Sequence, residues 1–332
     1  MTTVVQLTSE EVTDLARPAE YVEAVRAGYR DRGNGAPAEP RTLLTAPDGS
    51  GVLTTYVAIL PDVGAMGGYV YTAGFESADA WFTLPLFDAT SGEPLAIIDG
   101  AAMNPFKTGA AGAVAIDALA REDANVLGII GSGSQAWGQL VTAATVRDLD
   151  RVLVYSPTPE NRAAFAASFD ERLTATVTTV DAAASLVPEV DILITATSAD
   201  EPVFDGDLLE PGTHITTMGQ YHPARREVDT TTIERSRYVP DLRERIHRDA
   251  GAFIQARAAG AVDDDHVHAE LGEVVAGVKP GRTDPTDITL FDSGGTAIET
   301  VAAARLLYDR AMAAGLGTEV SWFPASEAFV GQ

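Results

Sequence analysis

The feature that most constrains the fold is a glycine-rich turn between an apolar run and a helical pattern. The run Val126–Ile130 leads into Gly131-Ser-Gly-Ser-Gln-Ala136. After a buried strand, the first glycine permits a tight bend, the second lets a pyrophosphate approach the backbone, and a small third residue lets helix and strand pack closely. The helix N-terminus adds free N–H groups and a positive dipole end. The sequence therefore predicts a dinucleotide site around Gly131 and Gly133.

The segments after this turn alternate between strand and helix. Strands are expected at Val152–Tyr155, Asp191–Thr197 and Thr213–Met218, and helices at Gln135–Val146 and Pro159–Phe169. Alternation of this kind implies a parallel, doubly wound α/β sheet of the Rossmann type.

The part of the chain before residue 118 reads as α+β. One helical stretch is expected around Glu10 to Gly28, and Asp88–Gly92 is a turn between two β-rich runs. These runs, at 51–60, 68–73, 81–87 and 94–99, predict a meander or half-barrel. A long alanine-rich helix is expected at Thr296–Ala314.

The charge balance is strongly acidic, with 48 Asp and Glu against 23 Lys and Arg and a net charge of -25. A hydrophobic content of 45% over 332 residues is enough to fill two domains, which opposes an acidic disordered chain. Molar salt shortens the Debye length to ~3 Å and screens such self-repulsion. The composition favours a haloarchaeal-type protein over an acidic mesophile protein. It lacks the basic stripe that nucleic acid requires.

Cysteine is absent, so catalysis must use oxygen, nitrogen or a cofactor. No apolar run approaches the ~18 residues that cross a bilayer, and the first residues do not resemble a signal peptide. A cytoplasmic protein without a membrane partner is expected.

The end of the second Rossmann strand usually decides between NAD and NADP, because an acidic residue there bonds the ribose 2′-OH. This chain instead has Ser156 and Thr158, followed by Arg162. Hydroxyls and a guanidinium can receive a 2′-phosphate. NADP (NADPH) is therefore favoured, and NAD remains the alternative if Arg162 is only a solvated helix residue.

Several motifs together resemble those of the ornithine cyclodeaminase/mu-crystallin family, from near the N-terminus to about residue 318. They lie at 107–111, 131–136, 196–198, 227–229, 270–277 and 290–295. The resemblance implies a Rossmann domain at 119–305, inserted into a discontinuous substrate-binding and dimerisation domain at 1–118 and 306–332. It also implies a homodimer, a nicotinamide cofactor and a small amino or imino acid substrate.

Position by position, the resemblance implies that Arg41 holds the substrate carboxylate, that Thr108 contacts the cofactor and that Arg225 approaches it. Further cofactor contacts are implied for Ser134, Gln135, Thr197, Ser198, Gly219 and Ser293.

Three positions depart from ornithine cyclodeaminases. Tyr69 replaces a carboxylate-binding lysine, Lys107 replaces an arginine, and Tyr221 stands where the catalytic aspartate is expected. Tyrosine cannot hold an ammonium as a carboxylate does, and lysine loses bidentate geometry. Imino acid or ketimine reduction, or reversible amino acid dehydrogenation, is therefore favoured, with Arg41 and Lys107 as a carboxylate clamp. Tyr69, Tyr221 or His222 would donate the proton.

Two other functions remain within this resemblance. One is ornithine cyclisation to proline with release of ammonia, and the other is binding of NADPH and a small ligand without catalysis, as in mu-crystallin. A metal site is a further possibility, since His266, His268 and Glu270 follow an acidic run. A solvated loop capping a helix that starts near Glu270 is favoured there.

Overall fold

The computed structural model describes residues 2–76 and 80–323, and the chain forms two compact units. The first unit contains Met1–Lys107 and Thr296–Gln332, and the second contains Thr108–Gly295. The chain passes between units within helix α3 (Asn104–Leu119) and again just before helix α10 (Ala297–Ala314). The boundaries expected near 118 and 306 lie inside these two helices.

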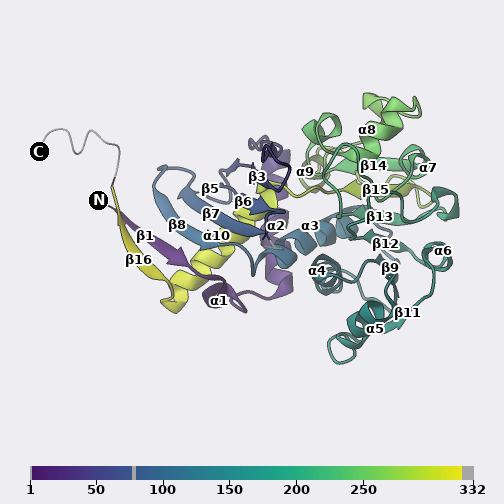
Figure 1. The fold of residues 1–332 in the computed structure, drawn as a ribbon, viewed down its shortest axis with the longest axis horizontal. Helices are drawn as coiled ribbons and strands as arrows, with labels where there is room; N and C mark the ends of the chain where they lie inside the picture. The colour runs from purple at the N-terminus through teal and green to yellow at the C-terminus, as the bar shows by residue number, and fades with distance from the viewer. Residues whose placement is uncertain (1, 77–79, 324–332) are drawn as a thin grey trace, which may run out of the picture. The chain divides into compact units, whose positions relative to one another are not determined.

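In the described part of the chain, the first unit holds a nine-stranded mixed sheet (Figure 1). Its main strand order is β16-β1-β8-β7-β6-β3-β2, and β5 pairs with β4 and β7. The strands are β1 Thr2–Leu7, β2 Thr42–Thr45, β3 Val52–Thr55, β4 Ala58–Leu60, β5 Ala65–Gly67, β6 Val70–Ala73, β7 Trp81–Asp88, β8 Pro94–Asp99 and β16 Thr318–Trp322. The expected β-rich runs and the long C-terminal helix are confirmed.

Two helices form the other layer of this unit. Helix α2 (Pro18–Gly33) packs against α10, and α10 also contacts β4, β5 and β7. A Cβ at Gly28 would lie 3.0 Å from the Ala302 Cβ, so small residues let these helices approach closely. The single helical stretch expected from Glu10 was wrong. A short helix α1 (Ser9–Val12) ends before Asp14, whose φ is positive, and Pro18 begins a new helix.

The described second unit is built on a seven-stranded, wholly parallel sheet with the order β11-β10-β9-β12-β13-β15-β14 (Figure 1). The strands are β9 Val126–Ile130, β10 Arg151–Tyr155, β11 Thr176–Thr179, β12 Ile192–Thr195, β13 His214–Thr217, β14 Ser236–Pro240 and β15 Ile288–Asp292. The helices are α4 Ser134–Ala143, α5 Pro159–Ala167, α6 Ala183–Leu186, α7 Thr230–Arg235, α8 Gly251–Ala258 and α9 Leu271–Val275. The doubly wound α/β class is confirmed.

The order of this sheet positions the site. Strand β9 lies between β10 and β12, so successive connections leave it in opposite directions. Ligands of such sheets bind beyond the carboxyl ends of the strands at this reversal. Helices α4 and α5 end earlier than expected, because the chain after each continues in turns with hydrogen bonds between residues three apart. Val146 N donates to Ala143 O, and Phe169 N donates to Ala166 O.

None of the helices in residues 2–76 and 80–323 combines the length and apolarity needed to cross a bilayer.

Candidate active site

The glycine turn lies at the reversal point of the parallel sheet. Gly131 has a φ of +126°, and a Cβ there would lie 2.3 Å from the carbonyl oxygen of Ala196, which follows β12. Glycine is therefore required by the protein itself at this position. Gly133 differs, because it is exposed and no described atom would lie within 4 Å of its Cβ. Protein packing gives no reason for glycine there, whereas close approach of a pyrophosphate does.

The start of α4 fits the phosphates of a dinucleotide. Ser134 and Gln135 occupy its first turn, where N–H groups lack acceptors within the helix. The buried Oε1 of Gln135 has no hydrogen-bond partner among the described residues. The N–H groups of this first turn, next to a glycine that packing does not require, are suited to phosphate oxygens, whereas the Gln135 oxygen could accept a hydrogen bond only from a donor such as a ribose hydroxyl.

The residues expected to choose the cofactor are held together at the end of β10. Ser156 is buried and its hydroxyl accepts a bond from Ser132 Oγ at 3.0 Å. Arg162 donates from Nη1 to the Ser156 carbonyl at 3.0 Å and from Nη2 to Asp181 Oδ1 at 2.5 Å. Thr158 is the exposed N-cap residue of α5.

Sequence reasoning missed Asp181, a carboxylate that is 98% exposed and follows the neighbouring strand β11. The βαβ order could have predicted this contact. The carboxyl ends of adjacent parallel strands lie at one edge of a sheet, so the residues after β10 and β11 lie close together.

A buried carboxylate, Glu227, joins the loops after β12 and β13. Its oxygens accept bonds from Thr197 N at 2.7 Å, Gly219 N at 2.7 Å and Thr195 Oγ1 at 2.9 Å. Burial raises the pKa of the Glu227 carboxyl, and these hydrogen bonds oppose that rise. Glu227 thereby fixes Thr197 and Gly219, two of the residues expected to contact the cofactor, with Ser198 next in the chain.

Ser293 is fixed by a second buried network after β15. Its hydroxyl donates to Asp241 Oδ2 at 3.2 Å, and Gly294 N donates to the same oxygen at 2.9 Å. The fully buried Arg245 neutralises this carboxylate through Nη1 at 2.8 Å and bonds Asp249 through Nε at 2.7 Å. Sequence analysis did not identify Asp241 or Arg245.

The other four predicted residues of the second unit lie in the loop after β13 and in helix α3. Tyr221 and His222 are in an exposed loop, and His222 Nδ1 accepts the Ala224 N–H at 3.1 Å. Arg225 is exposed and pairs with Asp200 at 3.0 Å. Thr108 is buried in α3, and its carbonyl accepts a bond from Gln139 Nε2 at 3.0 Å.

The first unit brings the two predicted clamp cations into one aromatic cluster. Arg41 Nε donates to the Tyr71 hydroxyl at 3.1 Å, and its guanidinium lies 5.3 Å from the centre of the Tyr56 ring. Lys107 Nζ lies 5.4 Å from the centre of the Tyr69 ring. Cations over aromatic faces are attracted by the ring quadrupole. The structure thus assembles both positive charges beside three tyrosines from the β3–β6 region.

Tyr69 itself is fully buried, and its hydroxyl donates to the Gly100 carbonyl at 3.0 Å. Burial raises the pKa of this phenol well above its usual range. A Cβ at Gly100 would lie 2.4 Å from the Tyr69 ring, so glycine there makes room for the side chain.

Sequence reasoning also missed Glu299, whose Oε1 lies 3.8 Å from Lys107 Nζ. Burial lowers the pKa of Lys107, and Glu299 opposes that effect. The signal that could have found Glu299 is Thr296-x-x-Glu299, a capping box at the start of the long helix.

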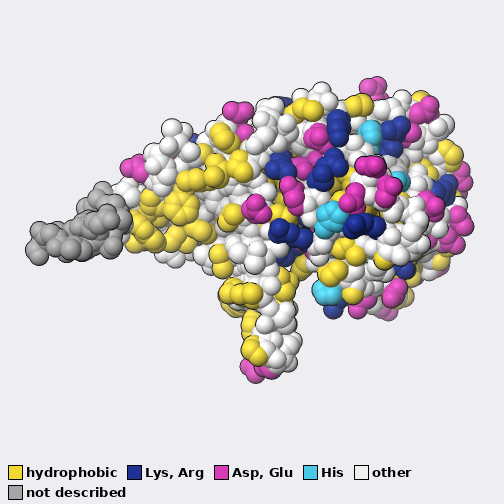
Figure 2. Space-filling model, turned by 90° about the horizontal axis from the view of Figure 1, so that it is seen from above, with side chains coloured by type: hydrophobic (Ala, Val, Ile, Leu, Met, Phe, Trp, Pro, Cys, Tyr) yellow, Lys and Arg dark blue, Asp and Glu magenta, His cyan; other side chains and the backbone are white. Residues whose placement is uncertain are grey.

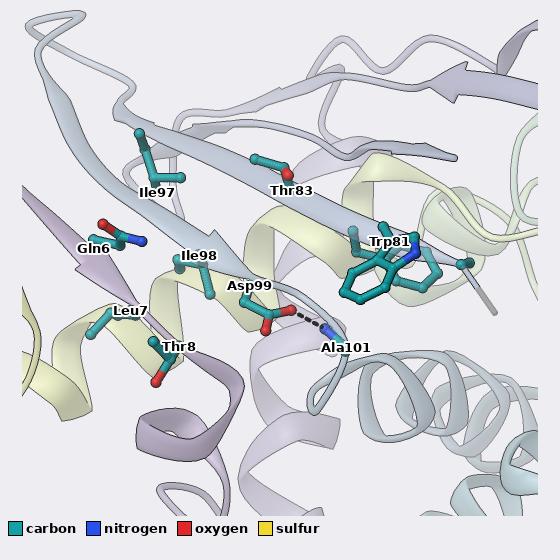
Figure 3. A pocket seen from close by; sticks show the side chains of 11 residues that line it. Gln6, Leu7, Thr8, Trp81, Thr83, Ile97, Ile98, Asp99 and Ala101 are labelled. Carbon is teal, nitrogen blue, oxygen red and sulfur yellow. Dashed lines mark hydrogen bonds between the residues drawn. The ribbon is translucent and has the colours of Figure 1, made fainter. Parts of the chain in front are cut away.

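A separate groove of about 460 Å³ lies on the first unit at the ends of β1, β7 and β8 (Figure 3). Trp81, Thr83 and Asp99 line it, and Asp99 Oδ1 accepts the Ala101 N–H at 3.1 Å. None of the predicted site residues is among its lining residues.

The side chains considered for a metal are engaged elsewhere. His266 Nε2 pairs with the Ile233 carbonyl at 2.7 Å and His268 Nε2 with the Pro280 carbonyl at 2.9 Å. Glu270 is the N-cap residue of α9, as expected. Within residues 2–76 and 80–323, no group of three His, Asp or Glu side chains could hold a metal ion.

The parallel sheet and its glycine turn define a dinucleotide-binding protein of the Rossmann type. The chain belongs to the ornithine cyclodeaminase/mu-crystallin family, whose model matches residues 2–315. It is 34% identical over 234 residues to an alanine dehydrogenase of Archaeoglobus fulgidus, covering 70% of this chain and 71% of that protein.

Two solved structures share this fold closely. The Delta(1)-pyrroline-2-carboxylate reductase of Thermococcus litoralis, in complex with NADH and L-proline, is 35% identical with a TM-score of 0.90, covering 96% of this chain and 100% of that one. An archaeal alanine dehydrogenase dimer with bound NAD is 29% identical with a TM-score of 0.89, covering 97% and 100%. The chain is an NAD(P)-dependent oxidoreductase of this family.

The two glycines of the turn should respond differently to alanine. Gly131→Ala should lower the melting temperature without cofactor, because a residue with a Cβ pays about 1–2 kcal/mol at positive φ and also meets the Ala196 carbonyl. Gly133→Ala should melt like wild type and lose roughly tenfold or more in cofactor affinity, since its methyl obstructs only the ligand. Thermal melts and fluorescence titration with NAD(P)H measure both. Unchanged cofactor affinity in Gly133→Ala would contradict the assignment.

Proposed function

We propose that this protein reduces a small cyclic or ketimine imino acid with NAD(P)H, or catalyses the reversible dehydrogenation of the corresponding amino acid. The observation that carries the proposal is the pair Arg41 and Lys107, two cations assembled in one aromatic cluster of the first unit. Relatives named for alanine and for pyrroline-2-carboxylate support this substrate class.

Arg41 and Lys107 would bind the substrate carboxylate. A guanidinium and an ammonium both donate charge-assisted hydrogen bonds, typically worth ~1.5–3 kcal/mol each. The Tyr71 hydroxyl accepts a hydrogen bond from Arg41, and the Tyr56 and Tyr69 rings lie beside the two cations. The bound nicotinamide supplies or accepts the hydride. Fixing the carboxylate fixes the adjacent imine carbon, so the clamp acts by orientation.

Reduction of an imine also places a proton on nitrogen. The Tyr69 hydroxyl already donates to the Gly100 carbonyl, which makes it the weakest of the three candidate donors. Tyr221 and His222 are exposed and remain the candidates for proton transfer.

Replacing either clamp residue should impair substrate use and spare the cofactor. Arg41→Met and Lys107→Met should each lower kcat/KM for the best imino acid by roughly tenfold to a hundredfold, the loss of one charge-assisted bond. NADPH affinity should stay unchanged. Steady-state kinetics and a separate cofactor titration measure the two effects.

Lys279→Met is the matched control, because Lys279 is the only other lysine of the sequence and its partly exposed side chain pairs with Glu273. Normal reduction by both clamp variants, or loss of NADPH binding in both, would refute the clamp. Tight NADPH binding by wild type with no turnover of any imino acid would instead identify a ligand-binding protein, and release of ammonia from ornithine would identify a cyclodeaminase.

For the cofactor, the proposal is that NADPH binds more tightly than NADH. Ser156 follows β10 where an acid would favour NAD, and the Arg162 guanidinium lies beside it. The exposed Asp181 already pairs with the Arg162 guanidinium, so a bound 2′-phosphate must displace the Asp181 carboxylate. Surface ion pairs are weak, and this exchange costs little.

Ser156→Asp should reverse the preference by at least roughly tenfold, because it puts a carboxylate against the 2′-phosphate. Asp181→Asn should tighten NADPH a few-fold and leave NADH unaffected, since only the phosphate uses Arg162. Dissociation constants for both cofactors test this, and a wild-type protein that already binds NADH more tightly would overturn it.

A homodimer built on the first unit is also proposed. Leu44, Leu53, Thr72 and Trp81 are register partners on β2, β3, β6 and β7, and Trp81 is 70% exposed. Hydrophobic side chains gather over part of the first unit, while charged side chains crowd the second (Figure 2). Exposed apolar side chains on neighbouring strands, such as Leu44, Leu53 and Trp81, are typical of a subunit interface.

Folding, activity and assembly should depend on salt. At molar KCl we expect an active dimer, and dialysis into dilute buffer should lower both melting temperature and activity because the net charge of -25 is no longer screened. Melting curves, assays and sedimentation across a KCl series measure this. Full activity and an unchanged melting point in dilute buffer would contradict the salt requirement, and a monomer at molar KCl would contradict the dimer.

A further inference from the structure

The most unusual buried pair in the first unit is Lys107 and Glu299. Their side chains are 2% and 0% exposed, and Nζ lies 3.8 Å from Oε1. Burying a charge without a partner is costly, so each needs the other or an equivalent. The clamp as described so far uses Lys107 and gives no role to Glu299.

Glu299 is held rigidly by the start of its own helix. Thr296 N donates to Oε1 at 2.6 Å, and Thr296 Oγ1 donates to Oε2 at 2.5 Å. The Thr296 hydroxyl in turn accepts the Ile298 N–H at 3.2 Å. This capping box fixes the carboxylate at the N-terminus of α10 and leaves Oε1 beside the lysine.

The groups that face Lys107 act in opposite directions on its proton. Burial is the largest influence and lowers the pKa of Lys107, and the positive charge of Arg41 lowers it further. Glu299 from α10 and Tyr71 from β6 raise it, while the Tyr69 ring offers its face to the ammonium. Among the ion pairs of the described residues, Glu299 lies with its Oε1 3.8 Å from Lys107 Nζ.

We propose that Glu299 is a positioning residue that keeps Lys107 protonated and aimed, and so sets the alkaline limit of substrate binding. The inference rests on the proposed carboxylate clamp. Only the ammonium form of Lys107 attracts a carboxylate, so substrate binding is lost as pH rises through the Lys107 pKa. Without Glu299 that pKa is lower, and the loss begins at a lower pH.

Glu299→Gln removes the negative charge and keeps the helix cap, because glutamine also serves at the third position of a capping box. We expect the alkaline limb of kcat/KM to move down by at least about one pH unit, which is roughly a tenfold loss of efficiency above the new limb. NADPH affinity and the acid limb should not move. Glu11→Gln is the matched control, since Glu11 caps α1 in a box with Thr8.

Lys107→Arg in the Glu299→Gln background is the decisive rescue. Arginine stays protonated throughout the assay range, so the alkaline limb should disappear even though Glu299 is still missing. A role of Glu299 in folding alone would give no such rescue. A limb that stays at the lower pH in the double variant would overturn the proposal.

Stability gives a second readout that does not require activity. Lys107→Met leaves the Glu299 carboxylate buried without its cation, so adding Glu299→Gln to that variant should raise its melting temperature. If Lys107→Met reduces substrate normally, the clamp itself fails. If Lys107→Met is impaired but Glu299→Gln keeps the wild-type alkaline limb, the clamp stands and the role of Glu299 is refuted.

Discussion

A buried carboxylate is tolerated only where several donors surround it, and this constraint organises the carboxyl edge of the parallel sheet, where the candidate cofactor site lies. Glu227 meets it by accepting from Thr195, Thr197 and Gly219, which belong to β12 and to the loops after β12 and β13. The loops are therefore fixed by the need to satisfy one side chain. Asp241 does the same for Ser293 and Gly294 after β15. The candidate cofactor contacts lie on segments that these two acids hold.

In the first unit, burial imposes the same requirement for compensating partners on positive charges. Lys107 and Arg41 are of like charge, and burial disfavours the charge on the lysine. Three kinds of group stabilise the two charges. The tyrosine rings attract the cations through their quadrupoles, the Tyr71 hydroxyl accepts a hydrogen bond from Arg41, and the Glu299 carboxylate places a negative charge near Lys107. In the proposed clamp, a substrate carboxylate would add a negative charge beside these two cations.

The acidic composition makes these buried groups distinctive. Of the two lysines in the chain, Lys279 is partly exposed beside Glu273, and Lys107 is buried. Arginine supplies the other positive charges, including the fully buried Arg245, because a guanidinium keeps its charge and can bond several acids at once. Among the buried acids, Glu227, Asp241 and Glu299 each accept hydrogen bonds from donors close by.

Local sequence determined the features that depend on neighbouring residues. The strand at Val126–Ile130, the turn at Gly131 and the alternation after it follow from periodicity and from the one backbone conformation that only glycine adopts easily. Family motifs added Arg41 and Lys107, and the structure brings these two cations together within the first unit. Tertiary structure alone decided which distant side chains meet them. Asp181 reaches Arg162 from the next parallel strand, and Glu299 reaches Lys107 from a helix far along the chain. The capping box marks Glu299 and the βαβ order places Asp181 near the sheet edge, but neither pattern names the partner. The pairing depends on strand order and helix packing, which distant segments set together.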